Sequence, residues 1–178
     1  GSRKLVDQIW PRLLAYGGGD AISSLTARFG NRLVACGPKA SVALVGPGID
    51  AVLVARKLAR DIALFDQRGC LSVQAVYTTY PAGELADALE WALAIEHRRL
   101  PPGPIPPSTA ALVQQLRGAA ALRARRLPEL PIAAGTVLIE PEPRFTPSPG
   151  VRTVCVHPLG ELRQGGALIR VISARDLH

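Results

Sequence analysis

Residues 65–72, which read Phe-Asp-Gln-Arg-Gly-Cys-Leu-Ser, form a short polar segment between a long helical pattern and a strand-like run. Cys70 within it could act as a nucleophile, because a thiolate attacks carbonyl carbons readily and a cysteine on a turn is open to substrate. Arg68 would favour the thiolate, although a turn arginine is as often simply solvated. A lone cysteine can equally be a small buried residue. The flanking elements therefore decide between a covalent catalyst and a core thiol.

The elements on either side place this segment at a junction. Apolar residues three and four apart predict a helix over residues 50–64, with Asp50 in its first turn and one buried face. Residues 73–79 are β-branched and aromatic and predict a strand, and residues 84–99 predict a second amphipathic helix. The order helix, thiol, strand, turn, helix favours the nucleophile.

The rest of the chain alternates strand and helix patterns. Strands are predicted at residues 12–16, 32–36, 41–45, 136–140, 151–156 and 168–172. Helices are predicted before Pro11, over residues 21–29 with Asp20 as N-cap, and from the capping residue Ser108 to 116 or onward to 127. Such alternation predicts an α/β fold of three layers, with helices on both faces of a sheet.

Two glycine turns are candidates for holding an anionic cofactor. Gly18 and Gly19 lie between the first strand and the helix at 21–29, where backbone N–H groups could face a phosphate. The alternative is an ordinary tight turn. Gly37 opens a second turn, in which Lys39 either approaches the cofactor or stays in solvent.

Composition narrows the function classes. The chain has 178 residues and a net charge of +7, and its arginines are densest at 98–99 and 123–126. Aromatic residues are not interleaved with these arginines, so no nucleic-acid partner is predicted and a solvated surface is favoured.

The sequence contains no run of about eighteen apolar residues, so it does not predict a membrane span. The three widely spaced cysteines predict neither a metal site nor a disulfide, and they suit a reducing cytoplasm.

The other candidate side chains are predicted to be structural. His97 and His157 are far from the cysteine segment in the pattern of elements, and both are expected at the surface or in loops rather than as its general base. Cys36 and Cys155 lie inside apolar strands and are expected in the core.

Three segments together resemble the acyl-CoA reductases of the bioluminescence fatty-acid reductase type, which belong to the aldehyde dehydrogenase superfamily. They are Gly37-Pro38-Lys39-Ala40-Ser41, the helix at 50–64, and residues 66–72. The superfamily pattern is a Gly-Gly-Lys-type turn, a helix, Gly-Gln-x-Cys, a strand and a helix. The reductases read like Asp-Gln-x-x-Cys-Leu-Ser, which residues 66–72 match.

The resemblance implies an aldehyde dehydrogenase-like catalytic domain and a reaction. Cys70 would attack an acyl-CoA or acyl-carrier thioester and hold the acyl group, with its own backbone N–H as one oxyanion donor. Hydride from NADPH would then release an aldehyde. The resemblance also makes Gly18, Gly19 and Gly37 cofactor contacts.

Two departures from the superfamily accompany the resemblance. The glutamate that activates hydrolytic water in oxidative members corresponds to about Ala35, and the glutamate that holds the nicotinamide ribose corresponds to about Val154. Loss of the first suits a reductase, whose acyl-enzyme must not be hydrolysed.

The resemblance also predicts the domain organisation. Residues 1–34 are expected to end a cofactor-binding domain or lead into the next, and residues 35–178 to form a catalytic domain cut short at its C-terminus. We expect this piece to be inactive alone, and leave open a homo-oligomer of the full-length enzyme. The alternative function is a non-catalytic α/β domain that uses its arginine-rich surface for assembly or anion binding.

Overall fold

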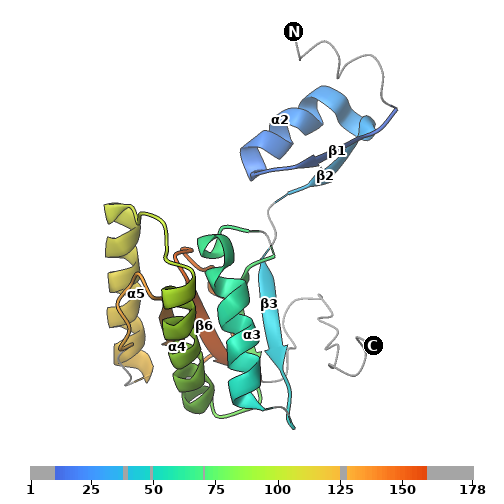
Figure 1. The fold of residues 1–178 in the computed structure, drawn as a ribbon. Coiled ribbons are helices and arrows are strands. Elements are labelled where there is room, and N and C mark those ends of the chain that lie inside the picture. The colour runs from blue at the N-terminus through green and yellow to red at the C-terminus, as the bar shows by residue number, and fades with distance from the viewer. Residues whose placement is uncertain (1–10, 38–39, 49, 70, 125–127, 160–178) are drawn as a thin grey trace. The chain divides into compact units, whose positions relative to one another are not determined.

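The computed structural model describes residues 11–37, 40–48, 50–69, 71–124 and 128–159 (Figure 1). The chain divides into two compact units, Gly1–Lys39 and Ala40–His178. The domain boundary predicted at residues 34 and 35 falls inside a strand of the first unit.

The first unit is a strand, a helix and a second strand. Strand β1 (Leu13–Tyr16) leads into helix α2 (Gly19–Phe29), the short 3₁₀ helix η1 (Gly30–Arg32) and strand β2 (Leu33–Cys36). The two strands are parallel, with Leu13 opposite Leu33 and Tyr16 opposite Cys36. The carboxyl ends of both strands therefore lie at one edge, from which the two glycine turns continue.

Helix α2 begins earlier than predicted. Its N-cap is Gly18, which has no side chain to cap the helix. Asp20 lies in the first turn instead of at the N-cap, because the Ile22 N–H already donates to the Gly18 carbonyl at 3.0 Å. The prediction of Asp20 as the capping residue is therefore wrong.

The second unit is built on four parallel strands. Strands β3 (Ser41–Val45), β4 (Val73–Thr78), β5 (Thr136–Ile139) and β6 (Thr153–Pro158) are arranged in the order β3-β4-β6-β5. Helix α3 (Ala51–Ala63) joins β3 to η2 (Leu64–Gln67) and β4, and helices α4 (Ala82–Arg99) and α5 (Pro107–Ala124) follow β4. Parallel neighbours need such crossovers, which place helices against the sheet.

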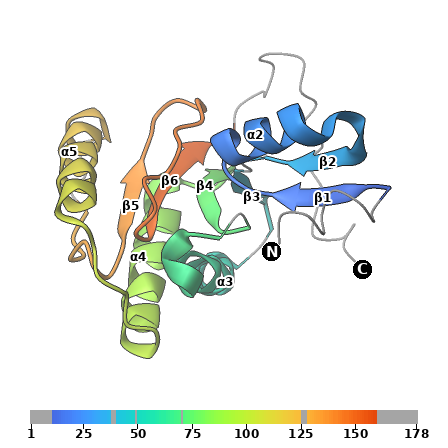
Figure 2. The same cartoon turned by 90° about the horizontal axis from the view of Figure 1, so that it is seen from above.

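The two faces of this sheet have different cores. Helices α3 and α4 lie side by side on one face (Figures 1 and 2), and their apolar residues pack against Val137, Val154 and Val156. On the other face, Leu138 and Cys155 pack with Ala120 of α5. Because successive strand residues point to opposite faces, both faces are covered by helices. The predicted three-layer α/β architecture is confirmed.

Several element boundaries differ from the prediction. Asp50 is the N-cap of α3 and accepts hydrogen bonds from the N–H groups of Val52 and Leu53, at 2.8 and 3.3 Å. Helix α5 runs through Gly118 without a break, and Ser108 lies inside it rather than capping it. A glycine in a helix costs only about 1 kcal/mol, which the packing of Val113 and Ala120 offsets.

Strand β6 starts at Thr153 and not at residue 151, because Val151 and Arg152 have left-handed φ values of 54° and 55°. The predicted helix before Pro11 and the predicted strand at 168–172 fall outside the described residues. Among the residues that the structure does describe, no helix is both long and apolar enough to cross a membrane.

The packing of Leu89 of α4 in the core of the second unit can be tested by substitution. Leu89 is fully buried between α4 and the sheet, so Leu89→Ala should lower the free energy of unfolding by about 2–5 kcal/mol. Urea unfolding followed by circular dichroism measures the change. Leu122→Ala is the matched control, because Leu122 is 86% exposed on α5, and its effect should stay below about 0.5 kcal/mol. Equal effects of the two substitutions would contradict the assigned core.

Candidate functional site

The segment that precedes Cys70 has an unusual backbone. Phe65, Asp66 and Gln67 have φ values of 53°, 51° and 62°, directly after α3 ends. A left-handed conformation costs an L-residue about 1–2 kcal/mol, so this kink needs compensating contacts. After it, the Ser72 N–H donates to the Gly69 carbonyl at 3.0 Å.

Cys70 itself lies outside the described residues. Its described neighbours show where the segment runs: Arg68 is exposed, and the Leu71 side chain is 83% exposed. Gln67 before them and Ser72 after them are buried. Exposed residues therefore stand on both sides of Cys70 in the sequence, and a buried residue stands beyond each of them.

Gln67 anchors the kink to the sheet. Its Nε2 donates to the carbonyls of Val73 and Thr153, each at 2.7 Å. Its Oε1 accepts from the Thr153 N–H at 2.8 Å and from the Ser148 hydroxyl at 3.1 Å. The amide thus uses both donors and both acceptor positions while 5% exposed. Each such bond contributes about 1 kcal/mol, which offsets much of the cost of the kink.

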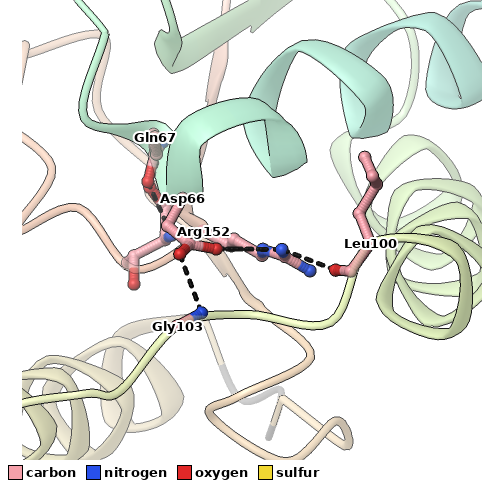
Figure 3. A network of polar contacts seen from close by, with 6 residues as sticks. Asp66, Gln67, Leu100, Gly103 and Arg152 are labelled. Atoms are coloured by element: carbon pink, nitrogen blue, oxygen red, sulfur yellow. Dashed lines mark hydrogen bonds and ion pairs between the residues drawn. The ribbon is translucent and has the colours of Figure 1, made fainter.

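Asp66 joins the kink to two further segments (Figure 3). Its Oδ1 accepts from Nε and Nη2 of Arg152, at 3.2 and 2.9 Å. Its Oδ2 accepts from the Gly103 N–H at 2.9 Å, and Arg152 Nη2 also donates to the Leu100 carbonyl at 2.7 Å. Asp66 and Arg152 therefore link the kink to the backbone of Leu100 and Gly103, in the segment after α4.

The glycine candidates lie together in the first unit. Gly18 and Gly19 follow β1, and Gly37 follows β2 at the same edge, where the Gly17 N–H donates to the Cys36 carbonyl at 3.3 Å. A Cβ added to any of the three would meet no atom within 4 Å. The N-cap of α2 is Gly18, so no N-cap side chain accepts a hydrogen bond from the backbone N–H groups of the first turn. These features fit a dinucleotide phosphate.

The other cysteines differ from one another. Cys155 is buried as predicted, and burial raises the pKa of its thiol to about 12. It therefore stays protonated at neutral pH and is a poor nucleophile. Cys36 is only partly buried. The prediction of a core position for Cys36 is wrong, because β2 belongs to a small two-stranded sheet.

His157 is also not where the sequence predicted it. It is a fully buried residue of β6, and its ring stacks on Tyr77 with centroids 4.9 Å apart. The Nδ1 atom lies 2.8 Å from the Glu142 carbonyl, and Nε2 has no hydrogen-bond partner within the described part of the chain. Burial raises the pKa of Tyr77. The expectation of a surface or loop histidine is wrong, because β6 lies inside the sheet. His97, by contrast, lies half-buried on α4.

The two positions that depart from the superfamily pattern lie in different units. Ala35 is an exposed residue of β2, and Val154 is fully buried in the core beneath α3 and α4. A carboxylate at residue 154 would be buried in that core. No group of three or more metal-binding side chains occurs among the described residues.

A basic groove of about 600 Å³ lies between α3 and α4. It is lined by four cations, two carboxylates and two aliphatic residues: Arg56, Lys57, Arg60, Asp61, Ala92, Ile95, Glu96 and Arg99. Arg60 and Arg99 both pair with the buried Glu96, at 3.6 and 3.4 Å. The arginines predicted as a surface group at 125 and 126 fall outside the described residues, and Arg123 pairs with Glu140.

Comparison with solved structures identifies the fold. Aldehyde dehydrogenase C from Pseudomonas syringae, solved as a mutant with NAD+ and octanal, has a TM-score of 0.60 at 11% identity, covering 83% of this chain and 36% of that one. A propionaldehyde dehydrogenase from the Clostridium phytofermentans fucose utilisation microcompartment gives 0.55 at 12%, covering 85% and 37%. An NAD-dependent benzaldehyde dehydrogenase from Corynebacterium glutamicum gives 0.56 at 12%, covering 83% and 37%.

The chain therefore has an aldehyde dehydrogenase-like fold and spans little more than a third of the length of these enzymes. Comparison with curated protein sequences gives no match. A family model described as acyl-CoA reductase (LuxC) matches residues 3–173, nearly the whole chain. The chain therefore belongs to the LuxC family of acyl-CoA reductases.

Proposed function

We propose that this chain is the catalytic portion of an NADPH-dependent acyl-CoA or acyl-carrier reductase, in which Cys70 carries the acyl group. The observation that supports this most strongly is the anchored kink at residues 65–67. It lies three to five residues before Cys70, in the segment that matches the reductase pattern. A location in the cytoplasm, where thiols stay reduced, suits such chemistry.

The first half of the reaction is acyl transfer to the thiol. The Cys70 thiolate attacks the carbonyl carbon of the thioester, and the backbone N–H of Cys70 donates to the oxyanion that forms. The bond between that carbon and the carrier sulfur then breaks, and the carrier leaves as a thiolate that takes up a proton. The acyl group is now a thioester on Cys70.

The second half is reduction of that thioester. NADPH, when bound, supplies the hydride that converts the acyl carbon to an aldehyde and frees the Cys70 thiolate. Backbone N–H groups at Gly18 and Gly19, with Gly37 beside them, would hold the cofactor phosphates. The exposed Ala35 offers no base where oxidative relatives activate water, so the acyl-enzyme is not hydrolysed before reduction.

The basic groove between α3 and α4 is the observation that favours the alternative function. Arg56, Lys57, Arg60 and Arg99 line it, and such a surface attracts anions. A domain that acts only through this groove would need no reactive cysteine. Whether Cys70 is acylated therefore separates the two functions.

Replacing the proposed nucleophile should abolish the covalent adduct. In the full-length enzyme without NADPH, an acyl-CoA should form an adduct that hydroxylamine removes, because hydroxylamine cleaves thioesters. Cys70→Ala should form none, whereas the control Cys36→Ala should form the wild-type amount. Acyl transfer from radiolabelled acyl-CoA measures both. An adduct that survives in Cys70→Ala would move the chemistry to another residue.

The glycine turn gives a separate test of cofactor binding. In the full-length enzyme, Gly18→Asp should weaken NADPH binding about tenfold, because a carboxylate at the N-terminus of α2 repels the phosphates. Gly18→Ala is the matched control, since a Cβ there meets no atom within 4 Å. Titration of NADPH fluorescence measures both affinities. Equal affinities in the two variants would exclude Gly18 from the cofactor site.

A further inference from the structure

We propose that Asp66 and Arg152 are positioning residues, which hold the Cys70 turn in the geometry that acyl transfer requires. The inference rests on the proposed function, in which Cys70 accepts the acyl group. Neither side chain needs to touch the substrate. Asp66 acts through the backbone of its own turn, four residues before Cys70.

Asp66 holds the turn from a side that Gln67 does not reach. Gln67 binds the backbone of Val73 and Thr153, so it fixes the turn to the sheet. Asp66 instead binds the Gly103 N–H, in the segment after α4, and the Arg152 guanidinium. The turn is therefore anchored on two sides, and its left-handed residues cannot relax while both anchors hold.

Arg152 is a rigid partner for this contact. It is 2% exposed, and its Nη2 also donates to the Leu100 carbonyl at 2.7 Å. Its own carbonyl accepts from the Thr136 N–H at 3.0 Å, and a Cβ at Gly135 would lie only 3.2 Å from that carbonyl oxygen. Its Nη1 has no hydrogen-bond partner among the described residues. Within the described part of the chain, the carboxylate paired with this buried guanidinium is that of Asp66.

Removing either side chain should displace the thiol without removing it. Acyl transfer needs the sulfur, the carbonyl carbon and the oxyanion donor in one geometry, and a displacement of about 1 Å can cost about 100-fold in rate. Alkylation by a small electrophile such as iodoacetamide needs only an accessible thiolate. The ratio of acylation to alkylation therefore reports orientation, whereas a merely structural role would change both rates together.

The experiment uses the full-length enzyme and the variants Asp66→Asn and Arg152→Met. Single-turnover acylation at saturating acyl-CoA should fall by about 10–100-fold, with half-saturation unchanged, and alkylation of Cys70 should stay within about twofold. The control Arg123→Met breaks another ion pair of the same unit, with Glu140, in which Arg123 also donates from two nitrogens. It should leave both rates unchanged.

The double variant should be no slower than the slower single variant, because the two side chains act as one unit. Acylation at the wild-type rate in Asp66→Asn, or an equal fall in acylation and alkylation, would overturn the proposal. If Arg152→Met does not fold, Asp66→Asn decides alone, since asparagine has nearly the same volume and the Asp66 side chain is 23% exposed. Failure of the proposed function gives a different result, in which the wild-type enzyme is not acylated at Cys70.

Discussion

The left-handed conformation of residues 65–67 is the constraint on which the candidate site depends. Three consecutive side-chain-bearing residues adopt it at the end of α3, and they do so because Gln67 and Asp66 are held by other parts of the chain. Their partners come from the start of β4, from the segment after α4, and from the residues that open β6. The position of residues 65–67 thus depends on several elements of the second unit.

Because most of these partners are distant in the chain, the sequence could predict only part of the candidate site. The helix before the cysteine segment and the strand after it follow local periodicity, and both are found where the pattern places them. The contact between Asp66 and Arg152 joins residues 86 positions apart, and no local pattern carries such a pairing. The same holds for His157, whose burial follows from the interior place of β6 in the sheet. The error over Asp20 is local. It was predicted as the N-cap of α2, but the N-cap is Gly18, two residues earlier.

The two halves of the proposed reaction belong to different units. The second unit carries the cysteine segment and its anchors, and the first carries the glycine turns, including Gly18 at the start of α2. The matched part of this chain covers only 36–37% of the length of two solved aldehyde dehydrogenases. In the reaction we propose, acyl transfer therefore uses contacts of the second unit, whereas the proposed cofactor contacts belong to the first.

The most direct test of the central claim is the location of the acyl group. The full-length enzyme is treated with an acyl-CoA in the absence of NADPH, digested under mildly acidic conditions that preserve thioesters, and mapped by tandem mass spectrometry. We expect the acyl mass on the peptide that contains Cys70, with Cys36 and the buried Cys155 unmodified. An acyl group on either of those cysteines, with Cys70 free, would contradict the account.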